Sequence, residues 1–157
     1  MKIEYLKELE LNPYRHGDPD MNNDPISLTE IENLERLYNN GKPFPKALKE
    51  LLFLAGKYCY VLEYGAFDSQ QEIQDYVREL LEEDNISIQR PFFVIDVYNA
   101  GSQFLYVYLD EGNNPAVYEG FHYFEINFNG YSHLTSSSLQ KFIESQIGAV
   151  KQGGNAF

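Results

Sequence analysis

The chain has 157 residues, and its 12 basic and 24 acidic residues give a formal net charge of −12. This charge argues against binding to phosphate backbones or anionic lipid surfaces, whereas a basic protein is a compatible partner. A hydrophobic content of 43% excludes a disordered chain, and the length suits a single domain over residues 1–157. Acidity also keeps a protein soluble without any role in binding. The charge alone therefore leaves two interpretations open, a surface for a basic partner and solubility only.

The chain contains one cysteine, Cys59. A single cysteine excludes an internal disulfide and any zinc site built on paired thiolates, and it favours a reducing compartment. Residues 1–11 alternate charged and apolar side chains and lack the apolar stretch of a signal peptide, and nowhere do about 18 apolar residues run together. We therefore expect a cytoplasmic protein without a membrane span.

Residues 12–25 are rich in Pro, Asn, Asp and Gly, which predicts an irregular connection after a short N-terminal element. A helix then follows, because Ser27 and Glu30 have the spacing of a capping box and apolar residues recur at helical intervals behind them. Gly41 marks the end of this helix. Pro45 suits the first turn of a second helix, where its missing N–H is not needed.

Residues 58–64 are β-branched or aromatic enough to predict a strand. Ser69 and Glu72 then offer a second capping box, which opens the most strongly amphipathic helix of the chain. The predicted apolar stripe of this helix consists of Ile73, Tyr76, Val77, Leu80 and Leu81.

The second half of the chain predicts strands at residues 92–98, 103–109, 116–119 and 121–128. The short connection through Gly101 indicates that the first two form a hairpin. Both alternating sets of side chains in residues 103–109 are apolar, so we expect a central strand that is covered on both faces. Short links between the strands imply antiparallel neighbours.

A last helix is predicted after one of three possible caps, Ser136, Ser137 or Ser138, and Gly148 is predicted to end it. Residues 148–157 are expected to form a flexible tail. Helices gathered before and after a run of strands predict an α+β fold, with a mainly antiparallel sheet and helices packed around it.

The sequence contains few candidate catalytic residues. Nucleophilic catalysis needs a nucleophile beside a base, but no nucleophile motif accompanies His16, His122 or His133. Cys59 lies among apolar residues, which is typical of a small core residue and not of a reactive thiolate. We expect no catalytic and no cofactor-binding residues.

The acidic loop before the first capping box approaches the spacing of a calcium-binding loop. Its oxygen ligands would come from Asp18, Asp20, Asn22 and Asp24. Asn23 stands where a sharp turn needs glycine, however, and Thr29 stands where a bidentate Glu belongs. We therefore predict a turn-rich loop and no metal site. Asp110 and Glu111 are likewise interpreted as part of a turn and not as an acid/base pair.

Negative charge is concentrated in residues 61–90, which contain eight acidic residues against Arg78 and Arg90. Five of the acidic residues recur at helical spacing, on the side of the predicted helix away from its apolar stripe. We call them the acidic ridge: Glu72, Asp75, Glu79, Glu82 and Glu83. The ridge is either an ordinary solvated face or a surface that docks a Lys/Arg-rich protein.

The run KPFPKALKELLFLAG at residues 42–56 resembles the opening of the SUKH superfamily, which is similar to fungal cell-wall-synthesis regulators and bacterial immunity proteins. Four later segments resemble the strands and closing helix of that family in the same order. They are FFVIDVY at 92–98, FLYVYLD at 104–110, NPAVY at 114–118 and SLQKFI at 138–143. The resemblance covers residues 28–147. The chain departs from the family where Ala55, Gly56 and Lys57 replace a frequent glycine pair, and where aromatic positions never hold Trp.

The resemblance implies an α+β domain that binds and blocks a toxin delivered by neighbouring bacteria, often a nuclease or a deaminase. It transfers no catalytic residue, and interfaces in the family vary with the toxin, so the acidic ridge is a separate physical prediction. Two other functions stay open. One is a regulatory or scaffolding module without a toxin partner. The other is small-molecule binding in an aromatic groove near Tyr98, Tyr106 and Tyr118.

Overall fold

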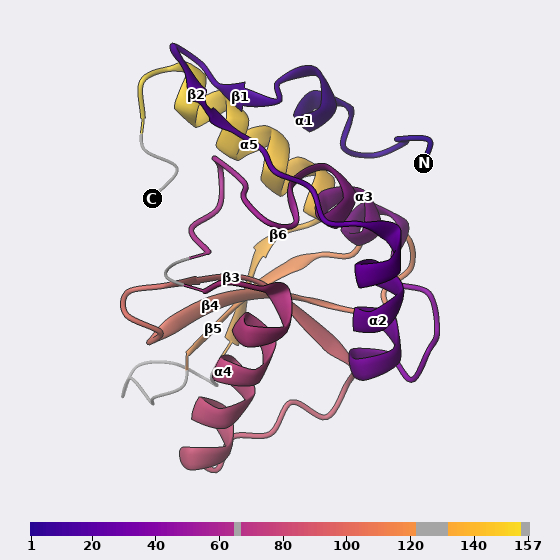
Figure 1. The fold of residues 1–157 in the computed structure, drawn as a ribbon. Helices are drawn as coiled ribbons and strands as arrows, with labels where there is room; N and C mark the ends of the chain where they lie inside the picture. Colours follow the sequence, from indigo (N-terminus) through magenta and orange to yellow (C-terminus); the bar gives the residue numbers. More distant parts are fainter. Residues whose placement is uncertain (65–66, 122–131, 155–157) are drawn as a thin grey trace.

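The computed structural model describes residues 1–64, 67–121 and 132–154, and these form five helices and six strands (Figure 1). The helices are α1 (Lys7–Leu11), α2 (Leu28–Tyr38), α3 (Lys46–Ala55), α4 (Gln70–Glu83) and α5 (Leu139–Lys151). The strands are β1 (Tyr14–Arg15), β2 (Asp18–Asn22), β3 (Phe92–Tyr98), β4 (Gln103–Tyr108), β5 (Val117–Phe121) and β6 (Ser132–Ser136).

The predicted α+β fold with a mainly antiparallel sheet is confirmed. Strands β3 to β6 form one antiparallel sheet in the order β3-β4-β5-β6, and β1 pairs with β2 in a small second sheet. In Figure 1, α3 and α5 lie on one side of the large sheet and α4 lies on the other. One hydrophobic cluster extends from Ile3 near the N-terminus to Val150 in α5. None of the described helices has the length and apolarity needed to span a membrane.

Strand β4 is an inner strand that is buried on both faces, as predicted. Phe104 and Tyr106 on one face have no exposed surface, and Leu105 and Val107 on the other are at most 3% exposed. Phe104 also explains why β5 contains Gly120, since a Cβ at that position would collide with the Phe104 ring.

The predicted caps are found at the starts of the helices. The Ser27 hydroxyl accepts a hydrogen bond from the Glu30 N–H at 3.2 Å, while the Glu30 carboxylate accepts one from the Ser27 N–H at 2.8 Å. Of the three candidate serines before α5, Ser138 is the cap. Ser69 caps α4 through the Glu72 N–H at 3.1 Å, but the Glu72 carboxylate bonds to the Asp68 N–H and not to the cap residue.

The predicted strand at residues 58–64 is not present. Tyr58 forms only an isolated antiparallel bridge with Asp24, and the chain then turns, with the Leu62 N–H bonded to the Cys59 carbonyl at 3.1 Å. Val61 and Leu62 are nevertheless buried next to each other. This segment is apolar because it lies inside the protein as an irregular turn. Its apolar residues do not alternate with polar ones, and this was a better guide to its structure than its β-branched and aromatic content.

Three other sequence predictions need correction. Residues 12–25 contain the β1–β2 hairpin, in which Gly17 takes the left-handed φ of +84°. Gly148 does not end α5, because the helix continues to Lys151 and buries Val150 on the face that already carries Ile147. Residues 148–151 therefore do not belong to a flexible tail.

Strand β6 was not predicted, because its sequence SHLTS is short and polar. The β5 strand extends from Val117 to Phe121, whereas the rest of the strand predicted at 121–128 lies outside the described residues.

Helix α4 covers the edge of the sheet at β3 through the side chain of Gln74, which has no exposed surface. Its amide Nε2 donates to the Val94 carbonyl at 2.7 Å, and its Oε1 accepts from the Val94 N–H at 2.8 Å. The side-chain amide therefore replaces the backbone of a further strand. An uncovered edge invites pairing with another chain, and covering it with a helix prevents this.

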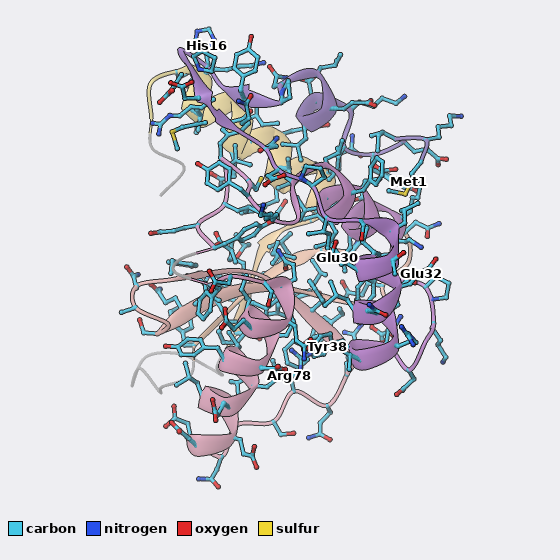
Figure 2. The ribbon with its side chains drawn as sticks, viewed as in Figure 1. Met1, His16, Glu30, Glu32, Tyr38 and Arg78 are labelled. Carbon is cyan, nitrogen blue, oxygen red and sulfur yellow. The ribbon has the colours of Figure 1, made fainter. Side chains whose placement is uncertain are left out.

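Arg78, one turn further along α4, extends the same contact. Its guanidinium donates to the Phe92 carbonyl at 2.9 Å and to the Gln74 Oε1 at 3.1 Å. The guanidinium carbon also lies 4.6 Å from the ring centre of Tyr38 and 4.3 Å from that of Phe92. Figure 2 labels Arg78 and Tyr38 where α4 and α2 meet. Since Tyr38 is the last residue of α2, this cation holds α2, α4 and β3 together.

Two buried carboxylates fix the segments around α3. Glu50 accepts hydrogen bonds from the N–H groups of Glu4, Tyr5 and Leu6 at 2.8–2.9 Å, which attaches the N-terminal segment to the helix. Glu35 accepts from the Phe44 N–H at 2.8 Å and forms a salt bridge with Lys49. The free-energy cost of burying each carboxylate is therefore offset by its hydrogen-bond and salt-bridge partners.

Asp96 in β3 is the least satisfied buried carboxyl group. It has no exposed surface, its Oδ1 accepts from the Val97 N–H at 3.0 Å, and its Oδ2 has no hydrogen-bond partner. Burial raises its pKa well above the ordinary value of 3.8, outweighing the stabilisation of the ionised form by the backbone of Glu63 and Val97. The nearby Glu63 charge raises it further. Folding thus shifts the equilibrium of Asp96 toward the protonated form.

Replacing Gln74 with Leu should lower the free energy of unfolding by about 2–6 kcal/mol. The change keeps the volume but leaves the buried Val94 N–H and C=O unsatisfied, at about 1–3 kcal/mol for each group. Gln71→Leu is the matched control, because Gln71 is exposed on the same helix and should shift stability by no more than about 0.5 kcal/mol. Urea denaturation of both variants measures the difference, and equal losses would contradict the role of Gln74.

Asp96→Asn should make stability less dependent on pH. A carboxyl group with a raised folded pKa binds its proton more tightly in the folded chain, so its contribution is fully present below pH about 4 and is lost as the pH rises. The loss is about 1.4 kcal/mol for each pH unit in which only the folded chain is protonated. The variant should therefore gain stability relative to the natural chain as the pH rises above about 4, in parallel denaturation curves. A constant difference would contradict this linkage.

Candidate functional site

The outer face of α4 carries the acidic ridge. Burial of Ile73, Val77 and Leu81 fixes the rotation of the helix about its axis. All five ridge residues are exposed as a result: Glu72, Asp75, Glu79, Glu82 and Glu83. None of these carboxylates forms a salt bridge with Lys or Arg in the part of the chain that the structure describes. The negative charge of this face therefore stays available to another molecule.

Two ridge carboxylates are held in place by hydrogen bonds. The Tyr38 hydroxyl donates to the Asp75 Oδ1 at 2.8 Å, and the Asp68 N–H donates to the Glu72 Oε2 at 2.7 Å. Burial of Tyr38 and its bond to Asp75 both raise the pKa of the phenol, so Tyr38 remains a hydrogen-bond donor. These contacts position both carboxylates before any partner binds, which reduces the entropy lost on binding.

An aromatic pair lies between the ridge carboxylates. The rings of Phe67 and Tyr76 are 5.0 Å apart at a tilt of 52°, and both residues are half-buried. With three ridge residues they line a shallow surface depression, which we call the α4 patch: Phe67, Glu72, Asp75, Tyr76 and Glu79. Tyr76 also packs on Gly101 in the β3–β4 turn, where an added Cβ would collide with its hydroxyl.

The α4 patch has the chemistry to bind a Lys or Arg side chain. Aromatic faces attract cations, and each such contact is worth about 0.5–1 kcal/mol at an exposed site. Carboxylates at the rim can accept hydrogen bonds from the same ammonium or guanidinium group. A purely solvated acidic face would lack the aromatic floor, so the pair of rings favours the docking interpretation of the ridge.

Sequence reasoning identified the acid side chains of this patch but missed its aromatic ones. Tyr76 was assigned to the apolar stripe, yet it lies at the boundary between that stripe and the ridge. Its position four residues after Glu72 and three before Glu79 was the available signal. Phe67 precedes the helix, and only the tertiary fold brings it against Tyr76.

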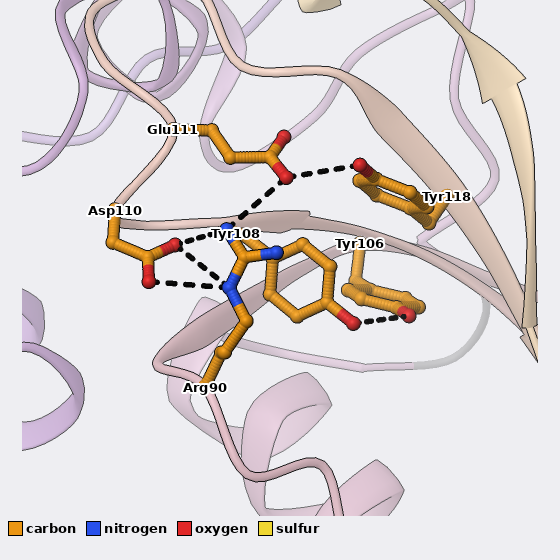
Figure 3. A network of polar contacts seen from close by, with 6 residues as sticks. All are labelled: Arg90, Tyr106, Tyr108, Asp110, Glu111 and Tyr118. Carbon is orange, nitrogen blue, oxygen red and sulfur yellow. Dashed lines mark hydrogen bonds and ion pairs between the residues drawn. The ribbon is translucent and has the colours of Figure 1, made fainter.

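A second polar network surrounds Arg90, just before β3 (Figure 3). Its guanidinium bonds to both oxygens of Asp110, at 2.6–3.2 Å, and to Glu111 at 3.1 Å, and it lies 3.9 Å from the ring centre of Tyr108. The Tyr118 hydroxyl also donates to Glu111 at 2.9 Å. Asp110 and Glu111 thus belong to a turn, as predicted, and Arg90 lowers the pKa of Asp110. The network joins β3, β4 and β5.

The three tyrosines of the expected aromatic groove do not lie together. Tyr106 is fully buried and stacks on its cross-strand neighbour Tyr118, with ring centres 5.6 Å apart. Tyr98 points to the other face of the sheet, where its hydroxyl bonds to Glu119. His133 in strand β6 also contacts Glu119, through Nε2 at 2.8 Å.

The remaining candidates occupy structural or exposed positions. Cys59 is fully buried, which raises the pKa of its thiol to about 12. His16 is exposed in the turn between β1 and β2, whereas His122 lies outside the described residues. Asp24 forms a salt bridge with Lys57, and no group of three or more His, Cys, Asp or Glu side chains within residues 1–64, 67–121 and 132–154 could hold a metal ion.

Another hollow near α4 lies between its N-terminus and α2. Its apolar wall includes Leu34 and Leu37, and its polar lining includes Lys57 and Gln70. The Gln70 amide donates to the Gly56 carbonyl at 2.7 Å, while its Oε1 is buried without a hydrogen-bond partner. Since this oxygen is shielded from solvent, it is not presented to a ligand in the hollow.

Comparisons with models of known families, with curated proteins and with solved structures found no match to this chain. The α4 patch is therefore interpreted from its own chemistry, and the resemblance to the SUKH superfamily rests on the sequence motifs.

Proposed function

We propose that this chain is a non-enzymatic protein-binding domain, and that it acts as a bacterial immunity protein that binds and neutralises a basic toxin domain. The α4 patch makes the central contact. The observation that supports this most directly is the Phe67–Tyr76 ring pair among exposed carboxylates that have no Lys or Arg partner in the described chain. The cations of a Lys/Arg-rich surface can contact both the aromatic rings and the carboxylates of this patch.

The net charge of −12 supports the same partner class. Complementary charge raises the rate of association and selects against acidic competitors, even where it adds little affinity. Toxins that act on nucleic acids, such as nucleases and deaminases, need basic surfaces to hold their substrates. A protein with an acidic, aromatic surface can cover such a site and exclude the substrate.

The resemblance of residues 28–147 to the SUKH superfamily supports a toxin as the partner. The same family resemblance also supports the alternative of a regulatory or scaffolding module, which would use the patch on a host protein. A reading frame for a toxin beside the gene favours the first function, and a gene that stands alone favours the second.

Co-expression should protect cells from the toxin encoded beside this gene. We expect growth to be restored when the chain and the toxin are produced together, and the two proteins to co-purify as a complex. An inactive toxin variant serves as the control for expression load. Cell death in the presence of folded, soluble chain would exclude neutralisation of that toxin.

Reversing Glu72, Asp75 and Glu79 to Lys should slow association with that toxin by about tenfold or more at low salt, because steering by complementary charge is lost. The rate should also become less sensitive to added salt. Stopped-flow or surface plasmon resonance measures both effects.

The matched control reverses three exposed acidic residues away from α4: Glu10, Asp20 and Glu32. Both triple variants change the net charge equally, and Glu32 points away from α4 in Figure 2. The control should associate much faster than the patch variant. Equal rates for the two would show that net charge, and not the α4 patch, guides the partner.

A further inference from the structure

The two edges of the large sheet differ. The β3 edge is covered by α4, through Gln74 and Arg78. The β6 edge is the opposite end of the strand order, and the residues His133, Leu134 and Thr135 are exposed there. An open edge is a template for pairing with another strand.

The hydrogen-bonding pattern shows which groups of β6 point outward. Val94 turns its N–H and C=O away from β4, since both bond to Gln74. In an antiparallel pair, the backbone N–H and C=O groups of two opposite residues either point toward each other or both point away. Tyr106 lies opposite Val94, so its backbone groups point away from β3 and bond to Tyr118 in β5. Tyr118 therefore turns away from β6, and Leu134 opposite it directs its N–H and C=O outward.

Ser132 lies two residues before Leu134 and points the same way by the same alternation. Neither residue has another backbone partner in the part of the chain that the structure describes. The register irregularity of the β5–β6 pair lies on the far side of Tyr118, between Val117 and Tyr118, so the Ser132–Leu134 section is regular. Two sets of outward groups are thus spaced for pairing with an added strand.

The side chains and charges of this edge suit a second copy of the chain. Residues 132–138 read SHLTSSS and contain no Asp, Glu, Lys or Arg, in a chain of net charge −12. The side chain of Leu134 is 58% exposed. His133 contacts the Glu119 carboxylate of the same copy through Nε2 at 2.8 Å. Two acidic copies can therefore approach here without placing carboxylates against each other, whereas a basic partner finds no opposite charge on the strand.

We propose that β6 pairs with β6 of a second copy, in antiparallel two-fold symmetry, to form a dimer with one continuous eight-stranded sheet. Ser132 of one copy lies opposite Leu134 of the other, so the outward N–H and C=O groups of both residues are satisfied. The exposed Leu134 side chains are buried near the two-fold axis. Both α4 patches remain at the outer ends of the sheet, so dimer formation and partner binding are independent.

Sedimentation of the full-length chain over a range of protein and salt concentrations tests this arrangement. We expect a monomer–dimer equilibrium that shifts toward dimer as salt is added, because salt screens the repulsion between two acidic copies. Binding of a basic partner at the α4 patch has the opposite salt dependence. A chain that is monomeric at all concentrations and salt levels would overturn the proposal.

Two variants test the edge itself. Leu134→Lys places a charge on the strand, and Leu134→Pro removes an N–H that points outward and leaves the β5–β6 ladder intact. Both should be monomeric and retain the circular dichroism spectrum of the natural chain.

Leu37→Lys is the matched control, because Leu37 in α2 is 56% exposed, nearly as much as Leu134, and should remain dimeric. A dimer that persists in Leu134→Lys would show that another surface holds the copies together. If the natural chain is monomeric and its binding to the toxin depends on Leu134, the β6 edge binds the toxin and not a second copy. This result would also overturn the proposal.

Discussion

The reciprocal hydrogen bonds between the Gln74 side chain and the backbone of Val94 decide how the rest of the structure is arranged. They place α4 along the β3 edge and fix which side of the helix faces inward. Arg78 adds a cation that lies against Tyr38 and Phe92 and joins α2 to the same edge. Without this contact the N–H and C=O of Val94 would be unsatisfied at the β3 edge.

The outward face of α4 follows from this inward contact. Since Gln74 and the apolar stripe face the sheet, the acidic ridge must face solvent, and Tyr76 at the boundary can meet Phe67. The other end of the sheet has a different character, because β6 is uncharged apart from His133 and its residues 133–135 are exposed. The molecule thus separates an acidic aromatic surface from a neutral strand edge.

The buried polar groups differ in how well they are satisfied. Glu50 has three backbone donors, and Glu35 has a backbone donor and a lysine, so both carboxylates connect segments that are distant in sequence. Asp96 leaves its Oδ2 without a hydrogen-bond partner, and burial raises its pKa well above the ordinary value. A carboxyl group inside a strand thereby links the stability of the sheet to pH.

Local sequence determined the helices, the β3–β4 hairpin and the acidic ridge, because capping, helical spacing and alternation act over a few residues. Ser27, Ser69 and Ser138 begin helices through bonds to amides three residues away, and such bonds can be predicted from spacing alone. Only the tertiary structure decided that residues 58–64 turn instead of extending, that α5 continues past Gly148, and that SHLTS joins the sheet. In these segments, packing against distant residues outweighs local preference. The same reason applies to the α4 patch, whose charges follow from the helix but whose aromatic floor needs Phe67 to fold back onto Tyr76.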